Sequence, residues 1–369
     1  MKAIRDKIKK LRYPYYVYRE IMKKKEERSV LWKDAVRQFD KGTAKHGSLR
    51  EYKRALYWHR FLYEEYNAYK LWDLDKEKWN DFISEREIQC IYRKLVQVNV
   101  GKCFTDKVKE LNVFKKFVHR KWLDPNSVSF ETFKEFVKST ECIAKPRGGR
   151  QGRNVFLIKK SDDLNLNELY KFCCKNCFLI EEYLRACKEI EEFHPNSLNS
   201  VRVLTISKGD KVELLDAEFR MGVHDNVVDN AHQGGILASI DLMTGILARN
   251  GVDLLGNEYT IHPDSGKFIK GFAIPHWNDI VRVCKEAATI VPETVFAGWD
   301  VCVLQKGEIE LIEVNAFPGV TGLQASSQRG IKPRLRETGE RVLGINPLKL
   351  ISVWSKSYVK YERKYGCYF

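Results

Sequence analysis

The chain has 369 residues, of which 44% are hydrophobic and 31% are charged, and its formal net charge is +15. No run approaches the roughly 20 apolar residues of a membrane-spanning helix, and the first residues lack the apolar segment of a secretory signal. The ten cysteines are scattered, so we expect a cytoplasmic protein with reduced thiols, long enough for about two or three domains.

The first 60 residues are strongly basic, with 19 Lys and Arg against 7 Asp and Glu, which is +12 of the net charge of +15. Apolar and aromatic side chains recur there at helical spacings, so we predict a basic helical region over residues 1–95. Two interpretations remain open. These helices pack on the rest of the protein with solvated basic faces, or residues 1–60 make peripheral contact with an anionic surface, such as inner-leaflet lipid or an acidic glycan. No nucleic-acid-binding motif is visible, and we do not expect a nucleic-acid partner.

A glycine-rich hairpin follows in the middle of the chain. One strand ends at Lys145-Pro146, a loop contains Gly148, Gly149 and Gly152, and a second strand returns from Val155. Glycines let backbone N–H groups approach phosphates, and a lysine at the strand end adds a positive charge. The loop also carries Arg147, Arg150 and Arg153, which favours a bound anion over a plain turn. It is neither a Walker A loop nor a Rossmann fingerprint, because no helix follows it.

The next predicted strand, residues 178–184, ends in two acids and an aromatic residue. Its backbone could pair with an adenine edge while Glu181 accepts a hydrogen bond from the exocyclic amine. The same residues also suit an ordinary edge strand with solvated acids.

Two apolar runs near the end of the chain predict a second hairpin, with a turn at Gln305-Lys306-Gly307-Glu308. Alternation places Glu313 and Asn315 on one face, and Asp300 joins them if the strands pair about this turn. Two carboxylates and an amide oxygen form a hard-oxygen site that suits Mg²⁺, which completes its shell with phosphate oxygens and water.

The order of these segments resembles the ATP-grasp superfamily, and most closely its bacterial sugar-transfer-associated branch, found with polysaccharide biosynthesis genes. The resemblance rests on Lys-Pro with the glycine-rich hairpin, then Ile-Glu-Glu-Tyr-Leu, Gly-Trp-Asp and Ile-Glu-Val-Asn-Ala-Phe-Pro-Gly-Val-Thr, and covers roughly residues 100 to 330. It implies an α+β fold, the ATP-grasp fold, in which two α+β lobes clasp ATP, here with a basic N-terminal helical extension, and it implies ATP and Mg²⁺ as cofactors.

The resemblance also implies roles for individual residues. Lys107 and Lys145 would contact the phosphates, and Gly148, Gly149 and Gly152 would form the lid. The adenine hinge would be Glu181, Glu182, Tyr183 and Leu184, and the magnesium ligands Asp300, Glu313 and Asn315. Arg220 would face the transferred phosphate, and together with Arg202 and Lys145 would be catalytic. Arg202, Asn230, Gly234 and Gly235 would hold the carboxylate substrate. The ribose contact stays open between Glu189, Glu191 and Asn199.

The function that follows is an ATP-dependent carboxylate–amine ligase with an acyl-phosphate intermediate. It would join an amino acid or amine to a sugar acid, as a small molecule or glycan, in surface-polysaccharide biosynthesis. The alternatives are an ATP-grasp phosphotransferase acting on a sugar or glycan, and a nucleotide-binding protein without turnover. The expected domains are the basic helical region (1–95), a linker subdomain (96–140), the small lobe (141–200), the catalytic lobe (201–345) and an aromatic tail (346–369).

Overall fold

The computed structural model describes residues 47–96, 104, 106–148, 154–160 and 165–351. Residues 1–46 of the basic N-terminal region and residues 352–369 of the C-terminal tail therefore lie outside the described residues. So do Gly149, Arg150, Gly152 and Arg153 of the glycine-rich loop. None of the helices in the described part of the chain is long and apolar enough to cross a bilayer.

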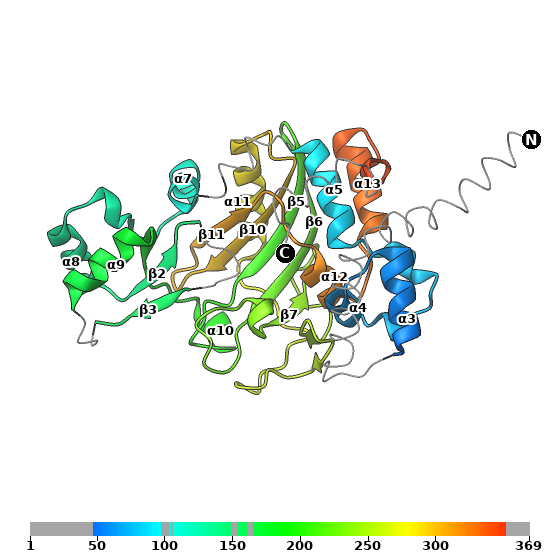
Figure 1. The fold of residues 1–369 in the computed structure, drawn as a ribbon, viewed down its shortest axis with the longest axis horizontal. Coiled ribbons are helices and arrows are strands. Elements are labelled where there is room, and N and C mark those ends of the chain that lie inside the picture. Colours follow the sequence, from blue (N-terminus) through cyan, green and yellow to red (C-terminus); the bar gives the residue numbers. More distant parts are fainter. Residues whose placement is uncertain (1–46, 97–103, 105, 149–153, 161–164, 352–369) are drawn as a thin grey trace, which may run out of the picture.

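Two antiparallel sheets form the framework (Figure 1). The strands of the large sheet are β5 (Val201–Lys208), β6 (Lys211–Met221), β7 (Ile236–Ser239), β8 (Gly251–Val252), β9 (Glu258–Tyr259), β10 (Phe296–Val303) and β11 (Ile309–Asn315). Those of the small sheet are β1 (Trp122–Leu123), β2 (Cys142–Pro146), β3 (Phe156–Ile158) and β4 (Phe178–Glu182). Within the described residues the orders are β11-β10-β5-β6-β7-β8-β9 and β1-β4-β2-β3. The α+β class expected from the sequence is confirmed.

Helices surround both sheets. The α-helices are α3 (Leu49–Arg54), α4 (Tyr63–Ala68), α5 (Glu85–Leu95), α7 (Lys107–Val113), α8 (Phe130–Ser139), α9 (Leu166–Lys175), α10 (Lys188–Glu191), α11 (Trp277–Ile290), α12 (Thr321–Ser327) and α13 (Lys332–Leu343). A π-helical turn follows α3 (Ala55–His59), and 3-10 turns lie at Leu71–Asp73, Lys78–Asp81, Lys115–Phe117, Pro125–Ser127, Ala231–Gln233 and Pro347–Leu350.

The large sheet buries a different apolar set on each face, as strand alternation requires. Val203 and Trp299 pack in one core with α11, whereas Leu204 and Phe296 pack in another with α5, α12 and α13. The second face is therefore covered by helices from both ends of the described chain.

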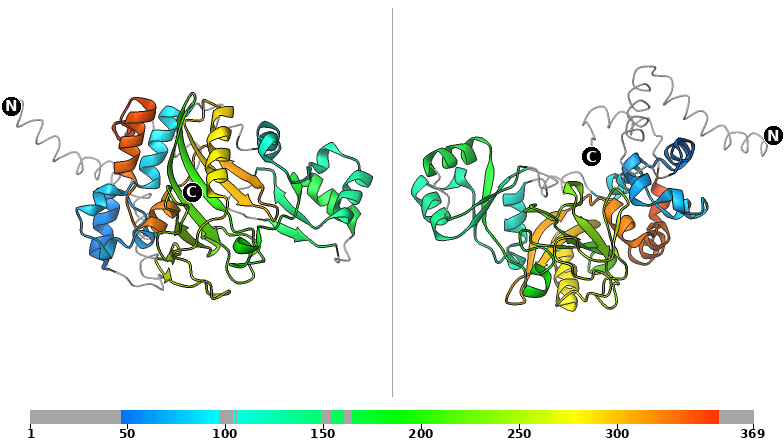
Figure 2. Two further views of the ribbon diagram at one scale, coloured as in Figure 1. Left: turned by 180° about the vertical axis from the view of Figure 1, so that it is seen from behind. Right: turned by 90° about the horizontal axis from the view of Figure 1, so that it is seen from below.

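The N-terminal helices are part of this large lobe. Of the helical region predicted over residues 1–95, the part from residue 47 is described, and it contains α3, α4 and α5 with π- and 3-10-helical turns between them. Helix α5 begins at a capping box in which Ser84 and Glu87 satisfy each other's backbone N–H groups. Buried aromatic residues of this segment, such as Phe61 and Tyr69, share a core with Leu237 of β7. Figure 2 shows these helices on the side of the large sheet away from the small lobe. Residues 49–95 thus form a wall of the large lobe rather than a separate extension.

The small lobe differs from its expected bounds of 141–200. Strand β1 pairs with β4, with Trp122 opposite Glu181, so the sheet begins inside the segment that we expected to be a linker. Helices α8 and α9 supply Phe133 and Cys173 to its core. At the other end, Ile190 and Phe193 pack in the core of the large sheet, because the chain has already crossed between the lobes.

Candidate active site

The hairpin of β10 and β11 brings the predicted oxygen donors to one place. Asp300 lies directly opposite Glu313, and Gly298 lies opposite Asn315. Cross-strand partners point to the same face of a sheet, so the three side chains share the face opposite Trp299. The predicted hairpin and the placement of its donors on one face are confirmed.

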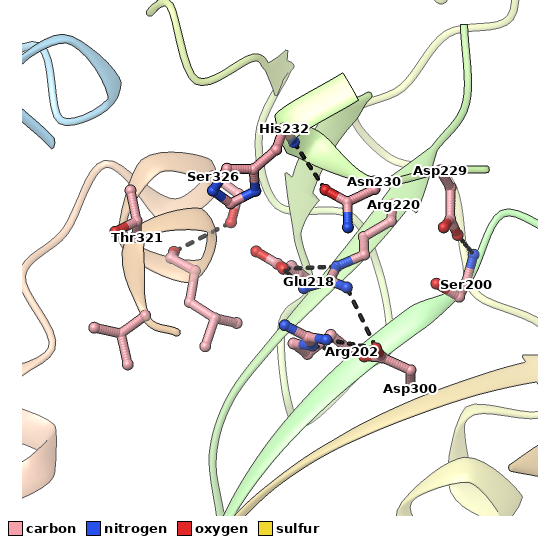
Figure 3. Close-up of polar contacts among 12 residues, drawn as sticks. Ser200, Arg202, Glu218, Arg220, Asp229, Asn230, His232, Asp300, Thr321 and Ser326 are labelled. Atoms are coloured by element: carbon pink, nitrogen blue, oxygen red, sulfur yellow. Dashed lines mark hydrogen bonds and ion pairs between the residues drawn. The ribbon is translucent and has the colours of Figure 1, made fainter. Parts of the chain in front are cut away.

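A row of charged side chains continues from Asp300 across the sheet (Figure 3). Arg202 of β5 lies opposite Asp300, and Glu218 of β6 lies opposite Arg202. The Arg202 Nε donates to Asp300 Oδ1 at 2.6 Å, and its Nη2 donates to Oδ2. Arg220 donates from Nη2 to Glu218 Oε1 at 2.8 Å, and its Nη1 lies 3.5 Å from Asp300 Oδ2. Both arginines that the sequence placed near the reacting groups thus contact the same carboxylate.

These contacts fix the charge states in the row. Burial alone would raise the pKa of Asp300, but Arg202 and Arg220 outweigh burial and hold that pKa below its ordinary value. Burial also opposes the charge of Arg202, but Asp300 outweighs it and raises the pKa of that guanidinium. Asp300 is therefore ionised at neutral pH, with two guanidinium groups beside it.

Lys107, the first of the two lysines predicted to contact the phosphates, lies beside the hairpin of β10 and β11. It is the first residue of α7, a helix capped by Asp106, and its Nζ lies 3.4 Å from Glu313 Oε1. Its backbone N–H donates to the carbonyl of Arg147 at 3.1 Å, which ties α7 to the start of the glycine-rich loop. Residues 206 positions apart in the chain therefore meet where the two lobes face each other.

Lys145 lies on β2 and points to Glu181 of β4, with 2.6 Å between Nζ and Oε2. Burial lowers the pKa of Lys145. Glu181 is also held by Arg120, whose Nε lies 3.0 Å from the same oxygen. Two cations thus occupy the carboxylate that we expected to accept from adenine. The side chain of Glu181 orients Lys145, and an adenine contact would have to come from the backbone.

Arg120 is the site residue that sequence reasoning missed. It reaches from the small lobe to Glu310 of β11 and also donates to the carbonyl of Leu311 at 2.7 Å. Nothing in the local pattern around Arg120 marks it, because both of its carboxylate partners are distant in sequence.

The remaining hinge residues lie in the connection between the lobes. Glu182 ends β4, Tyr183 donates its backbone N–H to Glu141, and Leu184 follows. Two residues later, Ala186 forms a β-bridge with Leu304 of the large lobe. These positions agree with a hinge between the lobes.

Arg147 does not serve as a free cation in the glycine-rich loop, contrary to our expectation. Its Nε and Nη2 donate to Asp106 at 2.7 and 2.8 Å, and its Nη1 donates to Asp124 at 2.8 Å. Carboxylates of the protein therefore compensate its charge. Gly148 is exposed at the start of the loop.

The predicted substrate residues Asn230, Gly234 and Gly235 form one tight turn. Asn230 Oδ1 accepts from the backbone N–H of His232 at 2.9 Å, and Gly234 has a φ of +90°. A Cβ at Gly235 would lie 2.7 Å from the carbonyl oxygen of Asp229, so a side chain does not fit there. The turn places Asn230 close to Arg220 (Figure 3).

Among the three ribose candidates, Asn199 is excluded. It is fully buried, and its side chain bonds to His194, Ile190, Ser197 and Gly222. Glu191 pairs with Arg185, and Glu189 is exposed, so neither is committed to the interior.

The residues present fit a magnesium–nucleotide complex. Glu313 and Asn315 offer the hard oxygen donors that Mg²⁺ prefers, and the Glu313 side chain is 32% exposed. Both oxygens of Asp300 accept from Arg202, so Asp300 would bind the metal only by exchanging this partner. Behind them, buried Glu110 accepts from the backbone N–H of Val314 at 2.8 Å, and burial raises its pKa to about 8. No group of three His, Cys, Asp or Glu in the described part of the chain forms a metal site by itself. The donor set would thus depend on Asn315, phosphate oxygens and water to complete the shell.

Two of three comparisons with known proteins find similarity to this chain. A search of curated proteins finds no match. Among solved structures, the ATP-grasp ligase PsnB with a minimal precursor is 14% identical over 62% of this chain and 57% of that chain, with a TM-score of 0.39. The L-amino acid ligase from Bacillus licheniformis is 12% identical over 68% and 47%, with a TM-score of 0.40. The ADP complex of purK, N5-carboxyaminoimidazole ribonucleotide synthetase, is 12% identical over 60% and 47%, with a TM-score of 0.39.

The chain spans about half the length of these solved structures. A family model described as sugar-transfer associated ATP-grasp matches residues 119–340, which takes in both sheets and every predicted magnesium ligand. Because this match covers more than half of the chain, the chain belongs to the sugar-transfer associated ATP-grasp family.

Proposed function

We propose that this protein is an ATP-dependent carboxylate–amine ligase that releases ADP and works through an acyl phosphate. The observation that carries the proposal is the contact between Lys107 and Glu313. Lys107, the proposed phosphate ligand, lies beside the small lobe, and Glu313, the proposed metal ligand, belongs to the large lobe. A site for Mg²⁺-ATP between two lobes requires a cation and an acid to lie close together in this way.

In this proposal each lobe supplies part of the nucleotide site. Lys145 and Lys107 bind phosphate oxygens, and Arg120 with Glu181 holds Lys145 in place. The backbone of residues 182–184 faces the base. Glu313 and Asn315, with Asp300, would hold Mg²⁺, which supplies positive charge at the phosphates.

The first chemical step forms an oxygen–phosphorus bond. A carboxylate oxygen of the substrate attacks the γ-phosphorus, the bond to the β-phosphate oxygen breaks, and ADP leaves. Arg202 and Arg220 lie beside Asp300, where they can neutralise the charge on the transferred group and on the substrate carboxylate. Positioning and cationic charge supply most of the catalysis in phosphoryl transfer, so no covalent nucleophile is needed.

The second step forms the amide. The amine attacks the carbonyl carbon of the acyl phosphate, inorganic phosphate leaves, and the amine loses a proton to solvent. We propose a sugar acid or related carboxylate as one substrate and an amino acid or amine as the other, in surface-polysaccharide biosynthesis. The words sugar-transfer associated in the family description support a sugar-linked substrate. We place this reaction in the cytoplasm, where ATP is supplied.

The proposal is tested by trapping the acyl phosphate. ATP and hydroxylamine are incubated with single carboxylates, namely uronic acids, nucleotide-linked uronic acids and amino acids, and hydroxamate and ADP are measured. We expect both products with one carboxylate class, and an amide by mass spectrometry when an amine replaces hydroxylamine. The Glu313→Gln variant is the control for contaminating activity. ADP release with a stable phosphate ester on a sugar hydroxyl, and no hydroxamate, would identify a phosphotransferase instead.

A further inference from the structure

The loop that follows Asn315 belongs structurally to the candidate active site. Residues 316–320 connect Asn315 at the end of β11 to α12. The loop folds back over the hairpin, since a Cβ at Gly298 would lie 2.7 Å from Cβ of Pro318. Gly298 is also the strand partner of Asn315. The position of this loop is therefore coupled to the position of Asn315.

The N-terminal wall holds this loop by hydrogen bonds that are partly or fully buried. Glu85 Oε1 accepts from the backbone N–H groups of Val320 and Thr321 at 2.6 and 2.8 Å, and from Thr321 Oγ1 at 2.9 Å. Tyr92, also on α5, donates its hydroxyl to the carbonyl of Pro318 at 3.1 Å. Pro318 and Val320, both in this loop, are thus hydrogen-bonded to side chains of the same helix, α5.

Further contacts fix α4 and α12 around the start of α5. Glu65 of α4 accepts from the backbone N–H of Glu85 at 2.7 Å. Gln324 of α12 accepts from the N–H of Ile83 at 2.9 Å and donates to its carbonyl at 2.8 Å. A misplaced loop would leave several buried polar groups without partners, which is energetically unfavourable.

Packing between the helices does not by itself require a carboxyl group at position 85. An apolar side chain could fill the space between α5 and α12, whereas a buried carboxylate is stable only with donors that satisfy it. A Cβ at Gly319 would lie 3.2 Å from Glu85 Oε1, so the loop backbone runs close to this carboxylate. Glu85 therefore specifies one conformation of the loop.

We propose that Glu85 is a positioning residue, which fixes the loop of residues 316–320 and through it the orientation of Asn315 in the magnesium–nucleotide site. Glu85 precedes residues 119–340, the part of the chain that the family model matches. The N-terminal wall is then a built-in part of the active site that lies outside the family match. The role assigned to Asn315 rests on the proposed function, whereas the role of Glu85 in holding the loop does not.

The test compares Glu85→Gln with Glu87→Gln in the full-length protein. Glu87 is a matched control, because it is buried on the same helix but pairs with Arg60 and Lys332 away from the loop. Hydrogen exchange reports on the loop without any ligand. We expect the backbone amides of Val320 and Thr321 to exchange at least about tenfold faster in Glu85→Gln and at the wild-type rate in Glu87→Gln, because replacing the carboxyl group by an amide weakens the hydrogen bonds that Glu85 alone accepts from these two residues. Unchanged exchange in Glu85→Gln, or equal acceleration in both variants, would overturn the proposal.

A second readout follows the effect to the site. We expect Glu85→Gln to raise the Mg²⁺ concentration needed for half-maximal ATP binding by about tenfold, by calorimetry, with no change in Glu87→Gln. Thr321→Val, which removes one of the three donors, should give a smaller shift in the same direction. If Glu85→Gln showed faster amide exchange but the wild-type Mg²⁺ dependence of ATP binding, the proposed effect of Glu85 on Asn315 would be wrong. A wild-type protein without Mg²⁺-dependent ATP binding would count against the proposed function, while the exchange result would still decide the role of Glu85.

Discussion

The protein has two ion clusters of similar composition, one buried between the lobes and one on the face of the large sheet that carries the candidate site. The buried cluster consists of Arg120, Lys145, Glu181 and Glu310, and the site cluster consists of Arg202, Arg220, Lys107, Asp300, Glu218 and Glu313. The side chains of Arg120 and Glu310 are 2% and 0% exposed, whereas those of Arg202 and Glu313 are 14% and 32% exposed. Similar charges can therefore serve two purposes. In the buried cluster they hold the lobes together, and in the site cluster they can exchange partners with a ligand.

The pKa directions are the same in the two clusters, so burial rather than charge state distinguishes them. Burial would raise the pKa of Glu181, but Arg120 and Lys145 outweigh burial and lower it. Burial would likewise lower the pKa of Arg120, but Glu181 and Glu310 outweigh it and raise that pKa. The ionised forms of Glu181 and Arg120 are thus favoured and compensate each other within the protein, and Lys145, at the edge of the cluster, is the member that can reach a phosphate.

The largest expected effect is on turnover when the site cluster loses an oxygen donor. Glu313→Gln and Asn315→Ala should each lower ATP turnover at least about 100-fold with little change in unfolding free energy, because both side chains would hold Mg²⁺ without filling a core. ADP release and urea unfolding measure the two quantities. Glu308→Gln, exposed in the turn of the same hairpin, is the matched control and should match wild type. Turnover within threefold of wild type for both site variants would remove the metal assignment.

Removal of a charged side chain from the buried cluster should instead lower the stability of the protein. Arg120→Met leaves Glu310 and Glu181 buried without their main partner, so the free energy of unfolding should fall by about 3–5 kcal/mol. Arg202→Met should lower it less, by about 1–3 kcal/mol, because Asp300 keeps Arg220 and some water. Urea unfolding of the two variants makes the comparison. An equal loss of stability would show that the two clusters do not differ in the way their burial indicates.

Lys145 pairs with Glu181 in the buried cluster and is also a proposed phosphate ligand. Its removal should therefore have a smaller effect than loss of a metal ligand. Lys145→Ala should weaken ATP binding by about 1.5–3 kcal/mol, the value of a charge-assisted phosphate contact, as measured by calorimetry. Lys160→Ala, an exposed lysine on the same lobe, should leave the affinity unchanged. Unchanged ATP affinity in Lys145→Ala would make this lysine a partner of Glu181 and nothing more.

The contrast between the clusters also explains what the sequence could predict. The Asp300–Glu313 pairing was accessible because it depends on local alternation and one turn, and a hairpin fixes the register. The contact between Arg202 and Asp300 spans 98 positions, and that between Arg120 and Glu310 spans 190. No periodic pattern encodes such pairs, because the folding of two lobes creates them.

The N-terminal wall also makes contacts that a local sequence pattern does not predict. Helical spacing predicted the helices of residues 49–95, since it depends on the apolar face of each helix. It did not predict that Tyr92 and Glu85 reach the loop after Asn315, more than 220 positions away. Similarly, Arg147 was expected to bind an anion because its partners Asp106 and Asp124 lie in another segment.

A buried carboxylate held by backbone N–H groups should behave differently from the ion-paired carboxylates of both clusters. Glu65 accepts from Leu62 and Glu85 N–H groups at 2.6 and 2.7 Å, and burial raises its pKa from 4.5 to about 8. The folded protein then binds this proton more tightly than the unfolded chain, so stability should fall as the pH rises from about 4.5 to about 8, by at most about 1.4 kcal/mol per pH unit. Glu65→Gln should remove the part of this slope that Glu65 contributes and leave the parts from Glu110 and Asp216, whose pKa values burial raises to about 8 and about 7. Glu64→Gln, exposed on the same helix, should keep the full slope. Urea unfolding at pH 5, 6, 7 and 8 measures the slope, and a Glu65→Gln variant as pH-dependent as wild type would show that Glu65 is ionised in the folded protein, like the paired carboxylates.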